Sequence, residues 1–403
     1  MLAALRRNLR LYPWYEAATW EGISAAVWYL YLFSYKGLSL AEMAWLLLLG
    51  EGVIVLAEVP TGWFADRLGR RLSMLTGIFF QALSAVLFIF GDSFITFWLA
   101  LAVCGLGDTF RSGADQALLY DSCLATNQRE RFRPLYANAV FIATIVMVIS
   151  EIAGGWIAVN VSWELPFWLE IGFSAFGFIA VWQMLEPPRI DRSVEAEAPS
   201  QDAPHNGRRK PGWMLWWRLM PLLAFAALIE VVPELANFHL PAELATELGL
   251  TPWHLGFMLA GFELLQGFGG KLAGHRRFSE PQRWLPWIAA GLMVCFALFS
   301  LRVWLGLAVY IIARAGIDFL FGLSGPLISE EANRRAHSAV RATALSVVNA
   351  GRRLIPLGLL PLSAFLVGRL TYAPAYLVML AGLAIPLVLA VVWLRKLREQ
   401  VLD

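Results

Sequence analysis

The stretch Gly62-Trp-Phe-Ala-Asp66-Arg67-Leu-Gly69-Arg70-Arg71 gathers one acid, three arginines and two glycines into ten residues. A long apolar run, from Leu40 to Leu56, leads almost directly into it. Neither this stretch nor the rest of the chain offers a nucleophile beside a base, a phosphate-binding loop or metal-ligand spacing, so an enzyme is not expected. The role of the stretch therefore depends on the segments around it.

The composition predicts an integral membrane protein. Of the 403 residues, 59% are hydrophobic and only 15% are charged, whereas soluble domains carry about 25% charged residues. The basic residues are scattered among short loops instead of forming one patch, so nucleic acid is not an expected partner. The three cysteines and five histidines show no disulfide framework and no metal-ligand spacing, so we expect no metal and no other cofactor.

Twelve segments are long and apolar enough to cross a membrane as helices, which takes about 20 residues each. The basic residues 1–10 precede the first span without an evident cleavage site, so we expect an uncleaved helix and not a signal peptide. The spans start near Leu11, Leu40, Leu72, Phe97, Pro134, Glu164, Trp213, Thr251, Leu285, Leu305, Ser338 and Tyr372.

The positions of the 32 lysines and arginines orient these spans. Four basic residues lie inside spans: Arg111, Arg314, Arg352 and Arg353. The loops on the side of the membrane opposite the two termini contain only three: Lys36, Arg302 and Arg369. All the others lie on the side of the termini, which the positive-inside rule makes cytoplasmic. We therefore expect a multi-pass protein of the cell (inner) membrane, embedded in the lipid bilayer, with both termini in the cytoplasm.

The longest loop divides the chain into two halves. It is polar, rich in proline and without periodicity, which predicts a flexible cytoplasmic linker over residues 186–212 between halves 1–185 and 213–403. Matching positions recur at a nearly constant offset in the two halves, for example Glu51 with Glu263 and Asp108 with Asp318. Such matches indicate duplicated six-helix halves, a common transporter plan.

The opening stretch resembles the loop motif Gly-x-x-x-Asp-Arg-x-Gly-Arg-Lys/Arg of the major facilitator superfamily of secondary transporters, and it matches that motif in full. With twelve spans, two halves and a long central loop, the resemblance covers the whole chain. It implies an all-α membrane protein whose two six-helix halves are related by a pseudo-two-fold axis. It also implies a monomer that transports a small molecule.

The resemblance further implies that the motif is a cytoplasmic latch. The family's acid faces the eleventh helix and one motif arginine pairs with an acid ending the fourth helix, which predicts that Asp66 faces the start of span eleven and that Arg70 pairs with Asp121. The expected latch residues are Gly62, Asp66, Arg67, Gly69, Arg70, Arg71 and Asp121. The alternative is that these charges only anchor a loop at the lipid headgroups. In the second-half copy the acid is lost, so a weaker latch is expected there, in which Arg276 or Arg277 can still pair with Glu331.

Acids outnumber bases inside the spans, where each charge is costly unless it faces protein or water. The surplus acids must be protonated, hydrated or near a cation, which suits a proton carrier. Asp108, Arg111 and Asp115 are spaced to share one helical face, with Arg111 bridging both acids. In the family, helices one, four, seven and ten line the central cavity. The resulting candidates for substrate or proton handling are Glu21, Asp108, Arg111, Asp115, Glu230, Glu234, Asn237, Arg314 and Asp318. The alternative is that the Asp108–Arg111–Asp115 and Arg314–Asp318 groups are structural ion pairs joining helices.

Arg352 and Arg353 are adjacent on one helix, so they point about 100° apart and cannot both face one cavity. We expect one of them to pair with Glu51 or Glu58, since helices two and eleven are neighbours in the family fold. An anion-binding role is the alternative.

The segments 111–122, 333–335 and 341–346 resemble a bacterial branch of the superfamily often assigned to drug or metabolite exporters. The leading hypothesis is a proton-coupled exporter of amphipathic organic compounds, cationic or neutral, because acids are in excess in the expected cavity. Span five departs from the motif usual in drug/proton antiporters, since only its final Gly154 and Gly155 are kept. The alternative is an importer or facilitator of a metabolite or organic anion that uses the intramembrane arginines. A non-transporting receptor or scaffold is the third hypothesis.

Overall fold

The computed structural model describes residues 2–19, 23–24, 27–188, 220–236, 252–301, 305–336, 341–370 and 372–402. Within these ranges the regular secondary structure is entirely helical, and no β-strand occurs. The predicted all-α class is therefore confirmed. The helices group into two compact units, Met1–Ile190 with Ser338–Val347 and Asp191–His337 with Val348–Asp403. From residue 189 onward, the predicted linker lies outside the described residues.

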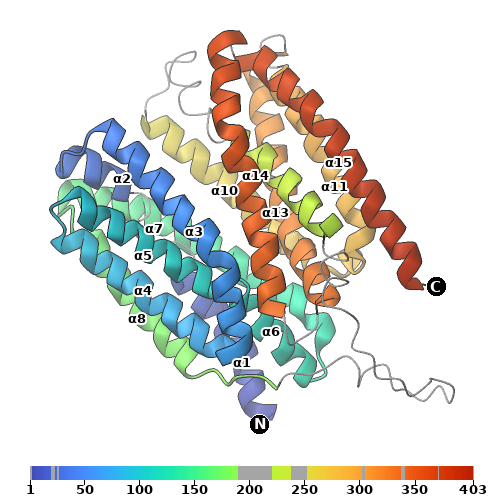
Figure 1. Ribbon diagram of the computed structural model, residues 1–403, viewed down its shortest axis with the longest axis horizontal. Coiled ribbons are helices and arrows are strands. Elements are labelled where there is room, and N and C mark those ends of the chain that lie inside the picture. The colour runs from blue at the N-terminus through green and yellow to red at the C-terminus, as the bar shows by residue number, and fades with distance from the viewer. Residues whose placement is uncertain are drawn as a thin grey trace. The chain divides into compact units, whose positions relative to one another are not determined.

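The first unit is a bundle of long helices (Figure 1). In chain order its elements are α1 (Leu2–Thr19), α2 (Trp28–Leu30), η1 (Tyr31–Tyr35), α3 (Leu40–Leu68), α4 (Arg70–Phe90), α5 (Phe94–Arg111), α6 (Ala114–Ala125), η2 (Arg129–Arg131), α7 (Phe132–Asn160) and α8 (Leu165–Trp182). Helix α4 packs against both α5 and α8, while α1 packs against α7 and α8.

Local sequence explains where α3 begins and ends. Ser39 and Glu42 form a capping box, in which the Ser39 hydroxyl accepts from the Glu42 N–H and the Glu42 carboxylate accepts from the Ser39 N–H at 2.8 Å. At the other end a single residue, Gly69, separates α3 from α4 with φ +117°. This conformation favours glycine, so Gly69 lets the chain turn within one residue.

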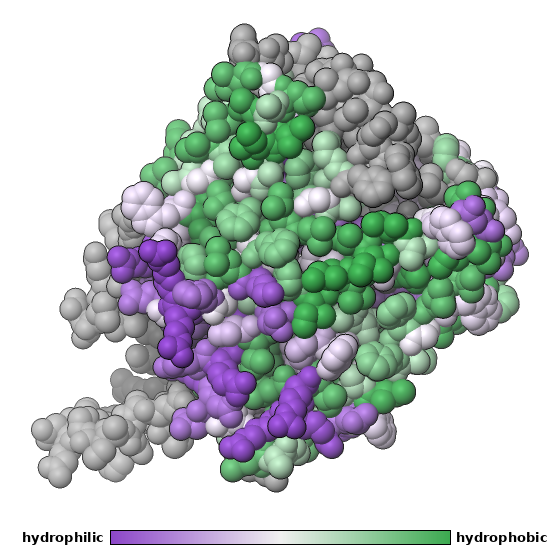
Figure 2. Space-filling model, turned by 180° about the vertical axis from the view of Figure 1, so that it is seen from behind, coloured by the Kyte–Doolittle hydropathy of each residue, from purple (hydrophilic) through white to green (hydrophobic). Residues whose placement is uncertain are grey.

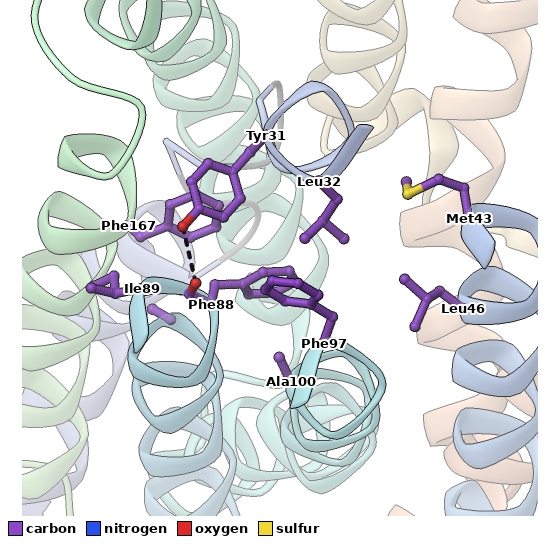
Figure 3. Packing of buried hydrophobic residues seen from close by; sticks show 10 residues of the cluster. Tyr31, Leu32, Met43, Leu46, Phe88, Ile89, Phe97, Ala100 and Phe167 are labelled. Atoms are coloured by element: carbon purple, nitrogen blue, oxygen red, sulfur yellow. Dashed lines mark hydrogen bonds between the residues drawn. The ribbon is translucent and has the colours of Figure 1, made fainter. Parts of the chain in front are cut away.

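Aromatic and aliphatic side chains close the end of this unit that lies farthest from Gly69 along α3. Figure 3 shows the cluster, in which the Tyr31 hydroxyl donates to the Phe88 carbonyl at 3.1 Å and the Phe88 and Phe167 rings stack. The buried members are Tyr31, Leu32, Met43, Leu46, Ala85, Phe88, Ile89, Phe97, Ala100 and Phe167. They hold η1, α3, α4, α5 and α8 together at this end.

The second unit contains a helical segment over 220–236 and four more long helices. These are α10 (Pro252–Ala273), α11 (Pro281–Ser300), α13 (Leu307–Arg335) and α15 (Tyr372–Leu402), with the short η3 (Arg276–Phe278) before α11. Helix α14 (Arg341–Leu370) begins in the first unit and continues in the second. Helix α13 packs between α10 and α11, and it meets α10 where Gly269 and Gly322 leave no room for a Cβ atom.

The surface and the helix lengths suit a bilayer. Within the described residues, eight helices are long and apolar enough to cross a membrane. Large apolar side chains face outward, and Leu56, for example, is 79% exposed. Figure 2 shows a face on which hydrophobic side chains cover a broad area while hydrophilic ones gather mostly in its lower part. The helices follow the order of the predicted spans, with 220–236 as the described part of the seventh.

Candidate functional site

The carboxylate of Asp66 binds the first backbone N–H groups of α14. Its Oδ1 accepts from the Ala342 N–H at 3.0 Å, and its Oδ2 accepts from the Thr343 N–H and hydroxyl at 2.7 Å each. These N–H groups have no partner within the helix, and the helix dipole favours a negative charge there. The contact expected between Asp66 and the start of span eleven is thus present in the structure.

Two arginines share the carboxylate of Asp121 on α6. Arg70 forms the ion pair that the sequence predicted, and Arg341 at the start of α14 forms a second one. Arg341 and Asp121 are fully buried, and the Arg341 guanidinium lies 4.6 Å from the centroid of the Tyr120 ring. Arg341 was not among the predicted site residues. Its position at the start of span eleven, where Asp66 was expected to bind, was the available signal.

The remaining motif residues surround these contacts. Gly62 faces α14 so closely that an added Cβ would lie 2.7 Å from the Ser346 Oγ. The Arg71 guanidinium donates to the Trp182 carbonyl at 2.6 Å, and the exposed Arg67 lies over the Trp63 ring.

Glu186 caps the start of α4, which sequence reasoning missed. Its two carboxylate oxygens accept from the Arg70 N–H at 2.9 Å and the Arg71 N–H at 2.8 Å. The neighbouring Leu185 backbone is held on both sides by the Asn8 amide, at 2.7 and 2.9 Å. The first residue of the predicted linker is therefore part of the motif's hydrogen-bond network.

The second-half copy of the motif has a different partner from the one predicted. Glu331 on α13 accepts from Arg335 and from Gln282, both at 2.7 Å, and not from Arg276 or Arg277. The prediction was wrong because Arg335 lies one helical turn after Glu331 and meets it without any loop contact.

Span four is broken in the middle of the predicted charge cluster. Helix α5 ends at Arg111, α6 begins at Ala114, and Gly113 between them has φ +74°. Arg111 binds Asp108 at 2.6 Å and the Thr19 carbonyl. Asp115 instead accepts from the Tyr12 hydroxyl at 3.4 Å and the Gln116 N–H at 2.6 Å. The expectation that Arg111 bridges both acids from one helical face is therefore wrong, because the Ser-Gly pair before α6 redirects the chain.

A further buried acid, Glu16 on α1, belongs to this region and was not predicted. It is 4% exposed and interacts electrostatically with Asp115 and Arg111. Tyr12 and Tyr15 on the same helix are buried beside it. The signal was the helical spacing of the polar and tyrosine side chains of span one, which predicts one shared face.

In the second unit, two of the arginine–acid pairs among the described residues use residues from the candidate list. Arg314 and Asp318 form a bidentate pair within α13, with atoms 2.6 and 2.7 Å apart, and both side chains are buried. This pair lies within one helix and does not join two helices.

Arg352 on α14 binds Glu230 on the 220–236 segment at 2.5 Å. Arg352 therefore points toward span seven, and the expected pairing of one of the two arginines with Glu51 or Glu58 stays a prediction for Arg353. The neighbouring Arg353 is exposed.

The other candidates are placed as follows. Glu234 is half-buried on the 220–236 segment, Glu51 is half-buried on α3, and Glu58 on α3 is 1% exposed. Glu21 and Asn237 lie outside the described residues. Among the residues that the structure describes, no three His, Cys, Asp or Glu side chains gather in a way that could hold a metal ion.

Comparison with known sequences gives related proteins. A model of the Major Facilitator Superfamily matches residues 15–357. The MFS-type transporter YxaM of Bacillus subtilis (strain 168) is 28% identical over 185 residues, which are 45% of this chain and 44% of YxaM. The D-galactonate transporter of Escherichia coli O6:H1 is 21% identical over 267 residues, covering 60% of this chain and 61% of that protein. The chain thus spans less than two thirds of the length of either relative.

Comparison with solved structures concerns the fold. The proton:xylose symporter XylE, bound to 6-bromo-6-deoxy-D-glucose, superposes with a TM-score of 0.75 at 14% identity, covering 98% of this chain and 94% of that one. At this identity the likeness shows the fold alone. That fold is the one predicted from the sequence.

Proposed function

The chain belongs to the Major Facilitator Superfamily, and we propose that it is a proton-coupled secondary transporter that exports amphipathic organic compounds, cationic or neutral, by alternating access. The superfamily and the matched solved structures are transporters and not enzymes. The chain is accordingly a multi-pass membrane protein. Its orientation with cytoplasmic termini, its location in the inner membrane and its monomeric state are parts of the proposal.

One observation carries the proposal: Glu16 and Asp115 are 4% and 9% exposed, and no arginine donates a hydrogen bond to either among the described residues. The partners of Asp115 are a tyrosine hydroxyl and a backbone N–H, which are neutral. A buried carboxyl that receives no hydrogen bond from a base favours binding of a proton or a cation.

The arginines support the same charge preference. Arg111, Arg314 and Arg352 each hold a carboxylate of the chain itself, at 2.6, 2.6 and 2.5 Å. An anionic substrate would first have to displace these carboxylates. A cationic or neutral substrate needs no such exchange.

Competition between a proton and an organic cation for one site would couple their transport and set the direction in which the cation moves. If a proton and an organic cation bind the same carboxylates, each excludes the other, and the protein exchanges them across the membrane. A proton gradient directed into the cell then drives the cation outward. We propose this exchange for the Glu16–Asp115 region.

The motif contacts support a cytoplasmic latch. Asp66, Arg70 and Asp121 are 6%, 2% and 0% exposed. A loop that only anchors itself at lipid headgroups does not need to bury its charges, because they remain in water or among headgroups. We propose that Asp66 and Asp121 hold the start of α14 while the cytoplasmic side is closed.

The test uses purified protein in proteoliposomes with tetraphenylphosphonium as the cation. Asp115→Asn should abolish proton-driven tetraphenylphosphonium export and weaken its binding roughly 10- to 150-fold, since a charge-assisted contact contributes roughly 1.5–3 kcal/mol. Glu42→Gln, which removes an exposed capping carboxylate of α3, is the matched control and should transport normally. Unchanged export by Asp115→Asn would contradict the proposal.

The likeness to the D-galactonate transporter favours one second candidate, transport of an organic anion through the arginines. A thermal-shift comparison of D-galactonate with tetraphenylphosphonium separates the two. A ligand at about 100 times its Kd adds roughly 2.7 kcal/mol of stability. Stabilisation by D-galactonate alone, lost in Arg111→Gln, would replace the cation proposal with the anion candidate.

A further inference from the structure

Glu170 is a buried acid that the site described above does not use. It lies on α8, faces α4 and the residues that follow α1, and is 4% exposed. The Gln81 amide donates to its Oε1 at 3.0 Å, and the Ser24 hydroxyl donates to its Oε2 at 3.5 Å. Both donors are neutral, so neither balances a negative charge at this depth.

The charged and titratable groups that face Glu170 come from α5. Arg111 and the Cys104 thiol interact with it electrostatically, and Asp108 acts on the same thiol. The Arg111 guanidinium, however, gives its hydrogen bonds to Asp108 and to the Thr19 carbonyl. Arg111, a base that interacts with Glu170, is therefore bound to another acid, and Glu170 has no guanidinium hydrogen bond among the described residues.

Two buried polar atoms near Glu170 have no hydrogen-bond partner in the described part of the chain. They are the Oε1 of Gln81, 8% exposed, and the Oγ of Ser174, one turn further along α8 and 1% exposed. An unpartnered polar atom in the interior is costly unless a ligand or another state of the protein satisfies it.

A proton on Glu170 would satisfy such an atom. The amide of Gln81 donates to a carboxylate through its nitrogen, and after a half-turn of the amide its oxygen accepts from a carboxylic acid. The Gln81–Glu170 pair is thus able to hydrogen-bond in both protonation states. This property suits an acid that takes up and releases a proton, because the pair keeps a hydrogen bond in both forms.

We propose that Glu170 binds a proton inside the first unit, held by Gln81 and Ser24. The carboxylate takes the proton from water and later returns it to water, without any transfer of electrons. The hydrogen-bond partners of Glu170 differ from those of Asp115, although Arg111 interacts electrostatically with both acids. The claim that Glu170 binds a proton does not depend on the proposed function. The claim that this proton drives transport rests on the proposed function.

The surroundings show what such a proton would influence. Ser24 follows Ile23, and an added Cβ at Gly154 of α7 would collide with the Ile23 carbonyl. An added Cβ at Gly177 of α8 would lie 2.5 Å from the Thr19 side chain at the end of α1. The end of α1 is therefore packed tightly against two helices. Loss of the Ser24–Glu170 hydrogen bond would allow this segment to shift. Because Arg111 donates to the Thr19 carbonyl, such a shift would also change the position of Arg111.

The first experiment detects the proton directly, without transport. Infrared difference spectra of the protein in lipid, recorded during a pH titration, should show a protonated carboxyl band that disappears in Glu170→Gln and persists in Glu170→Asp. Gln81→Leu, which removes the amide, should shift this band. The control is Glu164→Gln, half-buried just before α8, which should leave the band in place. A spectrum unchanged by Glu170→Gln would overturn the proposal.

The second experiment tests the coupling role in proteoliposomes. Glu170→Gln should lose proton-driven accumulation of tetraphenylphosphonium and retain exchange of labelled for unlabelled tetraphenylphosphonium, since exchange needs no net proton movement. Normal proton-driven accumulation would overturn the coupling role. If the unsubstituted protein moves no tetraphenylphosphonium, the proposed function fails while the infrared result still decides whether Glu170 binds a proton.

Discussion

The carboxylate of Asp121 balances the positive charge of two buried arginines. It is fully buried and accepts two arginines, Arg70 and Arg341, whose guanidinium groups are also buried. Removing one partner of a buried ion pair leaves charge without compensation, which costs roughly 3–5 kcal/mol. We therefore expect Asp121→Asn to lower the melting temperature of the purified protein strongly, as measured by thermal unfolding in detergent.

The matched control is the exposed ion pair between Lys36 and Asp92, whose atoms are 2.9 Å apart and whose acid is 87% exposed. Such pairs contribute about 1 kcal/mol or less, so Asp92→Asn should change the melting temperature little. Equal changes in melting temperature for the two substitutions would show that burial of the Asp121 ion pairs does not determine how much they stabilise the protein.

Helix α3 meets α14 through a glycine. A Cβ on Gly62 would lie 2.7 Å from the Ser346 Oγ and 2.9 Å from the Thr343 Cα, so one helix has to move. Overpacking of this kind costs about 1–3 kcal/mol. We expect Gly62→Ala to lower the melting temperature, measured in the same detergent assay.

Gly52 on the same helix provides the control, because nothing lies within 4 Å of its added Cβ. Gly52→Ala should leave the melting temperature unchanged or raise it slightly, since alanine favours a helix. If both alanine variants lower it alike, the loss comes from the helix itself and not from its contact with α14.

Helical elements were predictable from the sequence because a span depends on local apolar content, and the motif contacts were predictable because the family motif specifies both partners. Contacts between helices that no family motif specifies could not be predicted from the sequence. The pairing of Arg352 with Glu230 depends on the rotation of α14, which adjacent arginines leave open. The break at Gly113 follows from a φ of +74°, and the Ser-Gly pair signals such a break without proving it. Glu186 accepts a hydrogen bond from the start of α4, which lies more than a hundred residues earlier in the sequence. Local sequence patterns carry no information about contacts at such a separation.

The start of α14 would connect the proposed latch to the proposed transport cycle. Residues Ser338–Val347 group with the first unit, although the rest of α14 groups with the second. The proposed alternating access requires the two halves to move, and we propose that the contact of Asp66 with Thr343 breaks when the cytoplasmic side opens. The free thiol of Cys123, fully buried two residues after Asp121, is placed to report that opening.

We expect Asp66→Asn to speed alkylation of Cys123 in a variant whose other two cysteines are replaced by alanine. The substitution removes a charge from a helix N-terminus, which contributes up to about 2 kcal/mol when partly buried. A shift of 1–2 kcal/mol changes a two-state ratio roughly 5- to 30-fold, and the labelling rate should rise accordingly. Glu42→Gln, which removes an exposed carboxylate from the other end of α3, should leave the rate unchanged. Equal rates in all three proteins would mean that opening does not require the Asp66 contact to break, because Cys123 would then be reached by a motion that leaves the start of α14 in place.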